Sequence, residues 1–168
     1  MVGRALIMGL SFLAAARAPE SPTAPPKGWR YPTMAEISQD WRAVSPHKHA
    51  LISADFDGDR MQDRAMLLVK ANNMGAALVV ILGRMPNKAL VLEPLEDIGR
   101  LDVMGIEVVE PGQYETACGK GYFECEKGEP TVLSLKRPGI NFFTSESASS
   151  YFYYDTKSRS FKRVWISD

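Results

Sequence analysis

Short apolar runs separated by turn-forming residues recur along this sequence and restrict its fold more than any other feature. The runs are rich in valine, isoleucine, leucine and aromatic side chains, a composition typical of β-strands. Glycine, proline or asparagine lies between them. The sequence therefore predicts strands at Ala50–Phe56, Arg64–Lys70, Ala76–Leu82, Ala89–Leu92, Ile106–Glu110, Thr131–Leu135, Tyr151–Asp155 and Phe161–Ile166.

Two of the connections between these strands are short, at Ala71–Gly75 and Thr156–Ser160. Short connections join antiparallel neighbours, because a parallel crossover needs about a dozen residues or more. Leu67–Val69 and Ala77–Leu82 are almost continuously apolar, which is typical of central strands covered on both faces. We therefore expect an antiparallel meander that resembles one blade of a propeller.

A helix is predicted before the first strand. Thr33 and Glu36 have the spacing of a capping box, in which each side chain bonds the main chain of the other residue. Apolar residues follow at helical spacing on one face, namely Met34, Ile37, Trp41 and Val44. Pro46 ends the helix, since proline disfavours a helical residue before it. The expected fold class is α+β, a mainly antiparallel β sheet with one N-terminal amphipathic helix that packs Trp41 against the sheet.

Residues 1–18 have the pattern of a signal peptide. Arg4 supplies the positive start, Ala5–Ala16 is an apolar run, and Ala16-Arg17-Ala18 has the small-x-small form of a cleavage site. Cleavage after Ala14 or Ala16 is an alternative, because Pro19 is a poor residue to follow a cut. The run is shorter than the roughly 20 apolar residues of a membrane span. We therefore expect a periplasmic or secreted protein.

Residues 19–32 hold five prolines and little that can form a core, which predicts a flexible leader. Residues 33–168 are then expected to form a single mainly β domain. Without residues 1–18 the chain has 18 basic and 20 acidic residues. This balance argues against a nucleic-acid partner, which usually leaves a basic footprint.

Cys118 and Cys125 are the two cysteines of the chain, and glycines at 119 and 121 lie between them. In an oxidising compartment this spacing predicts a disulfide. Closing so short a loop contributes roughly 2–3 kcal/mol in the chain-entropy model. The alternative, a two-cysteine metal site, lacks further ligands at useful spacing.

The acidic segment Asp55–Asp63 is the sharpest chemical signal in the sequence. Calcium takes six to eight oxygen ligands, and calcium loops place carboxylates at positions 1, 3, 5 and 9 with a main-chain carbonyl at position 7. The predicted ligands are therefore the carboxylates of Asp55, Asp57, Asp59 and Asp63 and the carbonyl of Met61. The alternative is a metal-free turn, because Arg60 and Arg64 can neutralise part of the charge. Arg60 also occupies position 6, where glycine usually eases a left-handed backbone.

This segment resembles the Asp-x-Asp-Gly-Asp-Gly-x-x-Asp loop of FG-GAP repeats of the integrin α and VCBS type. Asp55, Asp57, Gly58, Asp59 and Asp63 match, whereas Arg60 departs from the motif, and the motif occurs once. The resemblance implies a calcium ion between neighbouring strands. More broadly, the chain resembles a set of small exported proteobacterial proteins that combine one such loop with a Cys-Gly-Lys-Gly-Tyr segment and an aromatic C-terminal hairpin. The corresponding residues here are 118–122 and 151–165.

Aromatic residues gather in the last predicted hairpin. Strand alternation sends some of them to each face, so one face can present a patch of the type enriched at interfaces. The candidate interface residues are Tyr151, Tyr153 and Trp165. The alternative is that neighbouring elements cover both faces.

The sequence favours a binding role over a catalytic one. It holds no Gly-x-Ser-x-Gly, His-Glu-x-x-His or phosphate-binding glycine loop. We therefore expect a non-catalytic periplasmic binding protein with a protein partner, for example an inhibitor or immunity protein against an envelope-directed enzyme. One alternative is a structural envelope component. The other is an envelope hydrolase with a carboxylate pair drawn from Glu107, Glu110, Glu115 and Glu124.

Overall fold

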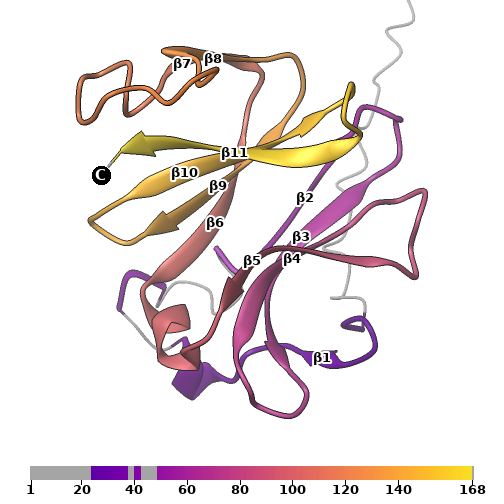
Figure 1. Ribbon diagram of the computed structural model, residues 1–168. Helices are drawn as coiled ribbons and strands as arrows, with labels where there is room; N and C mark the ends of the chain where they lie inside the picture. The colour runs from indigo at the N-terminus through magenta and orange to yellow at the C-terminus, as the bar shows by residue number, and fades with distance from the viewer. Residues whose placement is uncertain (1–23, 38–39, 43–48, 168) are drawn as a thin grey trace, which may run out of the picture.

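The computed structural model describes residues 24–37, 40–42 and 49–167, and its strands form two larger sheets and one small one (Figure 1). The first sheet has the order β1-β3-β4-β5, and β2 also pairs with β3. Every pairing in it is antiparallel. Its strands are β1 (Trp29–Arg30), β2 (Leu51–Ala54), β3 (Asp63–Lys70), β4 (Ala76–Ile81) and β5 (Ala89–Leu95).

The second sheet has the order β11-β10-β9-β6 and is also antiparallel throughout. A separate hairpin of two strands, β7 and β8, lies beside it (Figure 1). These strands are β6 (Met104–Val109), β7 (Gly112–Glu115), β8 (Val132–Leu135), β9 (Gly139–Thr144), β10 (Ser149–Asp155) and β11 (Ser160–Ser167). Each predicted strand overlaps an observed one, and the predicted antiparallel pairing is confirmed. The strands divide between separate sheets, however, and do not form the single blade-like meander that the sequence predicts.

The main hydrophobic core lies between the two larger sheets. Alternate residues of β3 and β4, such as Leu67 and Leu78, point into it and meet Ile106, Ile140 and Phe152 of the second sheet. The intervening residues of the same strands form a second cluster, which Trp29, Tyr31, Leu51 and Ala89 help to cover. The prediction that β3 and β4 are covered on both faces is therefore confirmed.

The first sheet takes in residues that the sequence assigns to the leader. Trp29 and Arg30 pair with Lys70 and Val69 at one end of β3. Arg30 also donates to both carboxylate oxygens of Glu36 and to the side-chain oxygen of Asn73. This polar link fixes the segment after β1 against the β3–β4 turn. Residues 1–23, which contain the predicted signal peptide, lie outside the described part of the chain.

Where an amphipathic α-helix is predicted, the described residues form two short 3₁₀ helices, η1 (Met34–Glu36) and η2 (Asp40–Arg42). Glu36 accepts the main-chain N–H of Thr33, as the capping box requires. The helical turn nevertheless stops at Ile37, whose φ is −140° and whose side chain is buried in the core. Residues 38–39 and 43–45 of the predicted helix lie outside the described residues. Trp41 does pack on the sheet, 5.8 Å from Phe143 of β9 between ring centroids.

One further 3₁₀ helix, η3 (Ile98–Asp102), joins the two sheets between β5 and β6. Its Leu101 is fully buried in the main core. No helix in the described part of the chain is long and apolar enough to cross a membrane.

The predicted disulfide between Cys118 and Cys125 is confirmed, with a Cα–Cα distance of 4.9 Å. It closes a loop in the connection from β7 to β8, and this loop meets β11 through the bond from the Ala117 N–H to the Trp165 carbonyl. The disulfide thus closes the loop within the hairpin connection, and the Ala117–Trp165 hydrogen bond beside it ties that connection to the second sheet.

Reduction of this disulfide is expected to lower the free energy of unfolding by about 2–3 kcal/mol, because it restores loop entropy to the unfolded chain. Denaturant unfolding with and without reductant measures the difference. A Cys118→Ser, Cys125→Ser variant serves as the control and should match the reduced wild type under both conditions. Two reactive thiols in the denatured, unreduced wild type would contradict the bond.

Candidate metal centre

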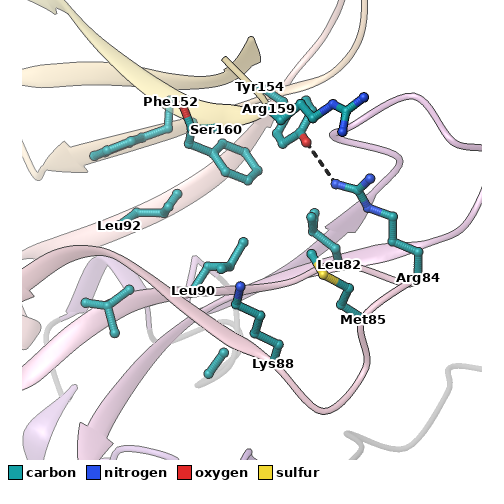
Figure 2. A pocket seen from close by; sticks show the side chains of 13 residues that line it. Leu82, Arg84, Met85, Lys88, Leu90, Leu92, Phe152, Tyr154, Arg159 and Ser160 are labelled. Atoms are coloured by element: carbon teal, nitrogen blue, oxygen red, sulfur yellow. Dashed lines mark hydrogen bonds between the residues drawn. The ribbon is translucent and has the colours of Figure 1, made fainter. Parts of the chain in front are cut away.

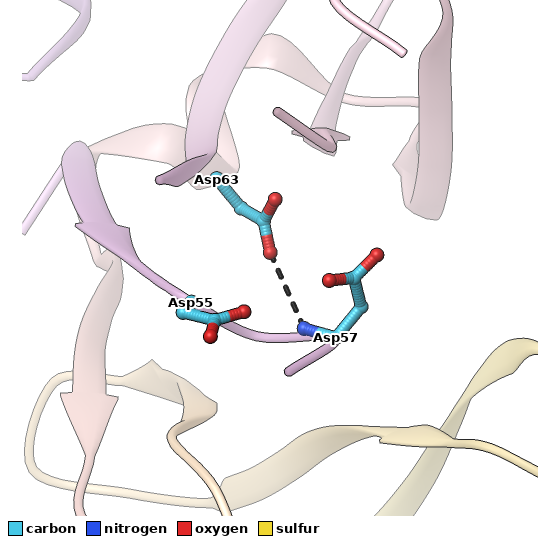
Figure 3. Close-up of side chains that lie close together, drawn as sticks. All are labelled: Asp55, Asp57 and Asp63. Atoms are coloured by element: carbon cyan, nitrogen blue, oxygen red, sulfur yellow. Dashed lines mark hydrogen bonds between the residues drawn. The ribbon is translucent and has the colours of Figure 1, made fainter. Parts of the chain in front are cut away.

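The acidic loop connects β2 to β3, and its carboxylates turn toward one another (Figure 3). Asp55 follows the last residue of β2, and Asp63 is the first residue of β3. Ala54 and Asp63 are paired across the two strands, so the sheet register fixes both ends of the loop. The side chains of positions 1 and 9 are therefore held close together by the hairpin itself.

Asp63 anchors the loop to the sheet from a fully buried position. Its Oδ2 accepts the main-chain N–H groups of Phe56 and Asp57, at 2.8 and 3.3 Å. Its Oδ1 accepts the N–H of Gly83, 2.7 Å away in the β4–β5 turn. Burial raises the pKa of the Asp63 carboxyl, and these N–H groups act in the opposite direction. One carboxylate thus joins two turns that are far apart in sequence.

Asp55 shapes the tip of the loop. Its Oδ1 accepts the N–H groups of Gly58 and Asp59, and its Oδ2 accepts that of Arg60. A carboxylate has about four lone-pair positions, so these three bonds leave it capacity for a further contact. The loop is therefore wound around the Asp55 side chain, as a cation-binding loop is wound around its first ligand.

Asp57 is the most enclosed of the remaining acids, with a side chain that is 1% exposed. Its Oδ2 lies 2.9 Å from Arg84 Nε, yet it accepts no hydrogen bond of good geometry from the described residues. Burial raises the pKa of the Asp57 carboxyl, and Arg84 partly offsets this effect. A buried oxygen with spare acceptor capacity is costly unless a cation or donor reaches it.

Three of the five predicted ligands come together. One oxygen each from Asp55, Asp57 and Asp63 lies within 4.8 Å of the others. Calcium–oxygen distances are about 2.3–2.6 Å, so oxygens on opposite sides of one ion lie about 5 Å apart. The observed spacing fits a single calcium ion.

Asp59 and Met61 stand outside this three-residue cluster of described residues. Asp59 Oδ1 accepts the Met61 N–H at 2.7 Å, whereas its buried Oδ2 has no partner among the described residues. The Met61 side chain is largely exposed. The roles of the Asp59 carboxylate and the Met61 carbonyl as ligands stay predictions.

The loop backbone requires left-handed residues at two positions. Gly58 has a φ of 81°, and a Cβ there would lie 2.8 Å from Arg137 Nη1. Arg60 has a φ of 70°, the conformation that the glycine of the motif normally supplies. Arg60 is therefore a non-glycine residue held in the left-handed region, a conformation that is strained for such residues.

Arginines from two other turns reach the loop, and sequence reasoning missed both. Arg84 in the β4–β5 turn contacts Asp57, and Arg137 between β8 and β9 donates to the Asp57 carbonyl oxygen. The local sequence around either arginine carries no signal of this contact, because the folded sheets bring the turns together. Gly83 was missed for the same reason.

The predicted interface residues occupy two different environments. Tyr151 and Tyr153 are half-buried against a small cluster of Val109, Leu133 and Leu135. Trp165 is 40% exposed, and the Arg163 guanidinium lies 4.1 Å from the centre of its ring. Of the three, Trp165 presents the largest fraction of its surface to solvent.

The four glutamates of the hydrolase alternative, Glu107, Glu110, Glu115 and Glu124, are all exposed. Glu107 lies 2.9 Å from His49 Nδ1. None of the four lines the larger cavities described for this part of the chain. Comparison of the chain with protein-family models, with curated proteins and with solved structures gave no match.

Proposed function

We propose that this chain is an exported, non-catalytic binding protein in which a calcium ion holds the Asp55–Asp63 loop in shape. The observation that carries the proposal is the convergence of three carboxylates on one point. One of their buried oxygens, Asp57 Oδ2, lies near Arg84 but accepts no hydrogen bond of good geometry from the described residues. The Asp55, Asp57 and Asp63 carboxylates would hold the ion directly. Calcium would supply the positive charge that three clustered acids lack.

Arginines could neutralise the same loop without a metal, and the geometry argues against this alternative. Arg84 is close to Asp57 but does not align an N–H with its Oδ2. Arg137 is directed to a main-chain carbonyl and not to a carboxylate. At roughly 5 Å and an effective dielectric of 20, each pair of like charges costs about 3 kcal/mol before screening. A divalent ion among the carboxylates would contact all three of them, whereas Arg84 reaches Asp57 and Arg137 reaches a main-chain carbonyl.

The proposed binding face centres on Trp165. Tryptophan and arginine are enriched among the residues that dominate protein interfaces, and here Arg163 stacks on the exposed Trp165 ring. Arg163 is itself held by Glu93 at 3.1 Å and by the Ser150 hydroxyl at 2.9 Å. The pair is thus already ordered before a partner arrives, which reduces the entropy lost on binding. A protein partner such as an envelope-directed enzyme fits this face.

Two features support the export part of the proposal. The N-terminal apolar run precedes a small-x-small site, and the chain carries a disulfide, which persists in oxidising compartments. A periplasmic or secreted protein also meets millimolar calcium more readily than a cytosolic one, so a weak calcium loop can be occupied there.

Calcium is expected to raise the melting temperature of the wild type and to leave that of Asp57→Asn unchanged. At ten times its Kd, the ion adds about 1.4 kcal/mol to the free energy of unfolding. At a given calcium concentration Arg60→Gly should enlarge the gain, because it removes a positive charge beside the ion. Thermal melts with calcium and with chelator measure each effect.

The matched control for these melts is Asp97→Asn, which removes an exposed carboxylate that caps η3 far from the loop in sequence. It should keep the full calcium response of the wild type. Equal responses in Asp57→Asn and Asp97→Asn would show that the ion acts elsewhere and would contradict the proposed site.

A further inference from the structure

A cavity of about 450 Å³ opens between the two larger sheets at the end formed by the β4–β5 turn and the β10–β11 hairpin (Figure 2). Its volume lies within the range of about 300–1,000 Å³ that small-molecule sites occupy. Its apolar lining includes Leu82, Leu90, Leu92, Phe152 and Phe161.

This apolar lining stays partly open to solvent even though it continues the main core. Leu90, Leu92 and Phe161 pack against the core cluster but are only partly buried, whereas Phe152 behind them is buried. Apolar surface that remains accessible in a concave site gains free energy when a ligand covers it. The cavity therefore offers a concave, partly open site where a small molecule can cover apolar surface.

Cationic side chains surround this apolar lining. Arg84, Lys88 and Arg159 all line the cavity, and no carboxylate lies among its described lining residues. Neither Lys88 nor Arg159 is within 4.0 Å of a carboxylate of the described chain. Both side chains are exposed and free to turn toward a ligand. A low-dielectric cavity with charges of one sign at its rim concentrates ligands of the opposite sign.

The Arg84 guanidinium is a positively charged group that its neighbours hold in place at the cavity. Its Nη2 donates to the Tyr154 hydroxyl at 2.8 Å (Figure 2). Its Nε lies 2.9 Å from Oδ2 of Asp57 in the acidic loop. The Tyr154 ring in turn packs edge-on against Phe161, with centroids 5.4 Å apart. The guanidinium is therefore positioned by two partners, and Lys88 and Arg159 remain to neutralise an anion.

We propose that this cavity binds an amphipathic monoanion, a carboxylate carried by a single aliphatic tail. The tail covers Leu90, Leu92 and Phe161, and the carboxylate pairs with Lys88 and Arg159. This cavity is separate from the proposed calcium loop and from the proposed protein-binding face. Binding of the anion requires neither calcium nor a protein partner.

Calorimetric titration with decanoate in the presence of a chelator tests the proposal on the whole chain. Decanoate is expected to bind one site, and decyltrimethylammonium, which has the same tail and the opposite charge, at least ten-fold more weakly. Lys88→Gln and Arg159→Gly should each weaken decanoate binding by about two- to five-fold, the effect of one exposed charge pair. Arg159 has a φ of 52°, so glycine suits this position and the fold is retained.

The matched control is Lys157→Gln, an exposed cation of the same turn that does not line the cavity. It should leave the decanoate affinity unchanged. Equal affinities for decanoate and decyltrimethylammonium would show nonspecific adsorption and overturn the proposal. Equal losses of decanoate affinity in Lys157→Gln and Arg159→Gly would do the same. A third outcome is that the chain does not bind decanoate but co-sediments with phosphatidylglycerol vesicles in a manner that depends on Arg159. This outcome would assign the cationic side chains to a lipid surface and would also overturn the proposal.

Discussion

Replacement of Asp63 by alanine is expected to lower the free energy of unfolding by about 3–5 kcal/mol, even with calcium removed. The Asp63 carboxylate accepts three main-chain N–H groups, from Phe56, Asp57 and Gly83. Hydrogen bonds to a charged group contribute about 1.5–3 kcal/mol each, and buried donors left without an acceptor cost about 1–3 kcal/mol. The loss of the three hydrogen bonds and the cost of the unpaired N–H groups are not independent, so these energies do not add fully.

Denaturant unfolding of Asp63→Ala in chelator measures this loss, and the melting temperature should fall by about 10–15 °C. Asp97→Ala is the control, because its carboxylate accepts a single exposed N–H, from Gly99. That change should cost about 1 kcal/mol, the usual value for an N-cap. A loss in Asp63→Ala no larger than in Asp97→Ala would mean that the carboxylate does not anchor the two turns.

Leu67→Ala and Leu68→Ala are each expected to lower the free energy of unfolding by about 2–5 kcal/mol. These neighbours on β3 point to opposite faces of the first sheet, and both are fully buried. Leu67 belongs to the core between the sheets, whereas Leu68 belongs to the cluster on the other face. Truncation of either side chain removes buried surface and leaves a cavity.

The control for this pair is Val91→Ala on β5, where the side chain is 49% exposed. It should change the free energy of unfolding by no more than about 0.5 kcal/mol. Denaturant unfolding of the three variants compares the two faces directly. A large loss in Leu67→Ala together with a negligible one in Leu68→Ala would show that the outer face of the sheet is uncovered.

Strands with a dense apolar pattern could be predicted from the sequence, and those without it could not. The central part of β3, Ala65–Val69, and all of β4 could be predicted, because both of their faces are buried and every position there is apolar. β7 offers only Tyr114 among polar residues and glycine, and β9 follows Pro138 directly. β1 is two residues long and exists only because β3 is there to pair with it.

In the acidic loop, too, some contacts could be predicted from the sequence and others could not. Its three clustered carboxylates lie within nine residues, and hairpin pairing suffices to bring Asp55 and Asp63 together. Its neighbours Gly83, Arg84 and Arg137 come from turns that are distant in sequence, so no local spacing marks them. The predicted helix fails at Ile37 for a related reason, since burial of that side chain in the core overrides the local capping signal.

Direct titration of the metal-free chain with calcium tests the central claim. The three converging carboxylates predict one ion per chain with a Kd of about 10⁻⁴–10⁻³ M or weaker, the range of extracellular calcium modules. The same titration of Asp57→Asn should show no saturable binding, and Arg60→Gly should bind more tightly than the wild type. Wild-type heats that stay at the level of calcium dilution up to tens of millimolar would contradict the claim. The loop would then be a metal-free turn held by its own carboxylate–main-chain hydrogen bonds together with Arg84 and Arg137.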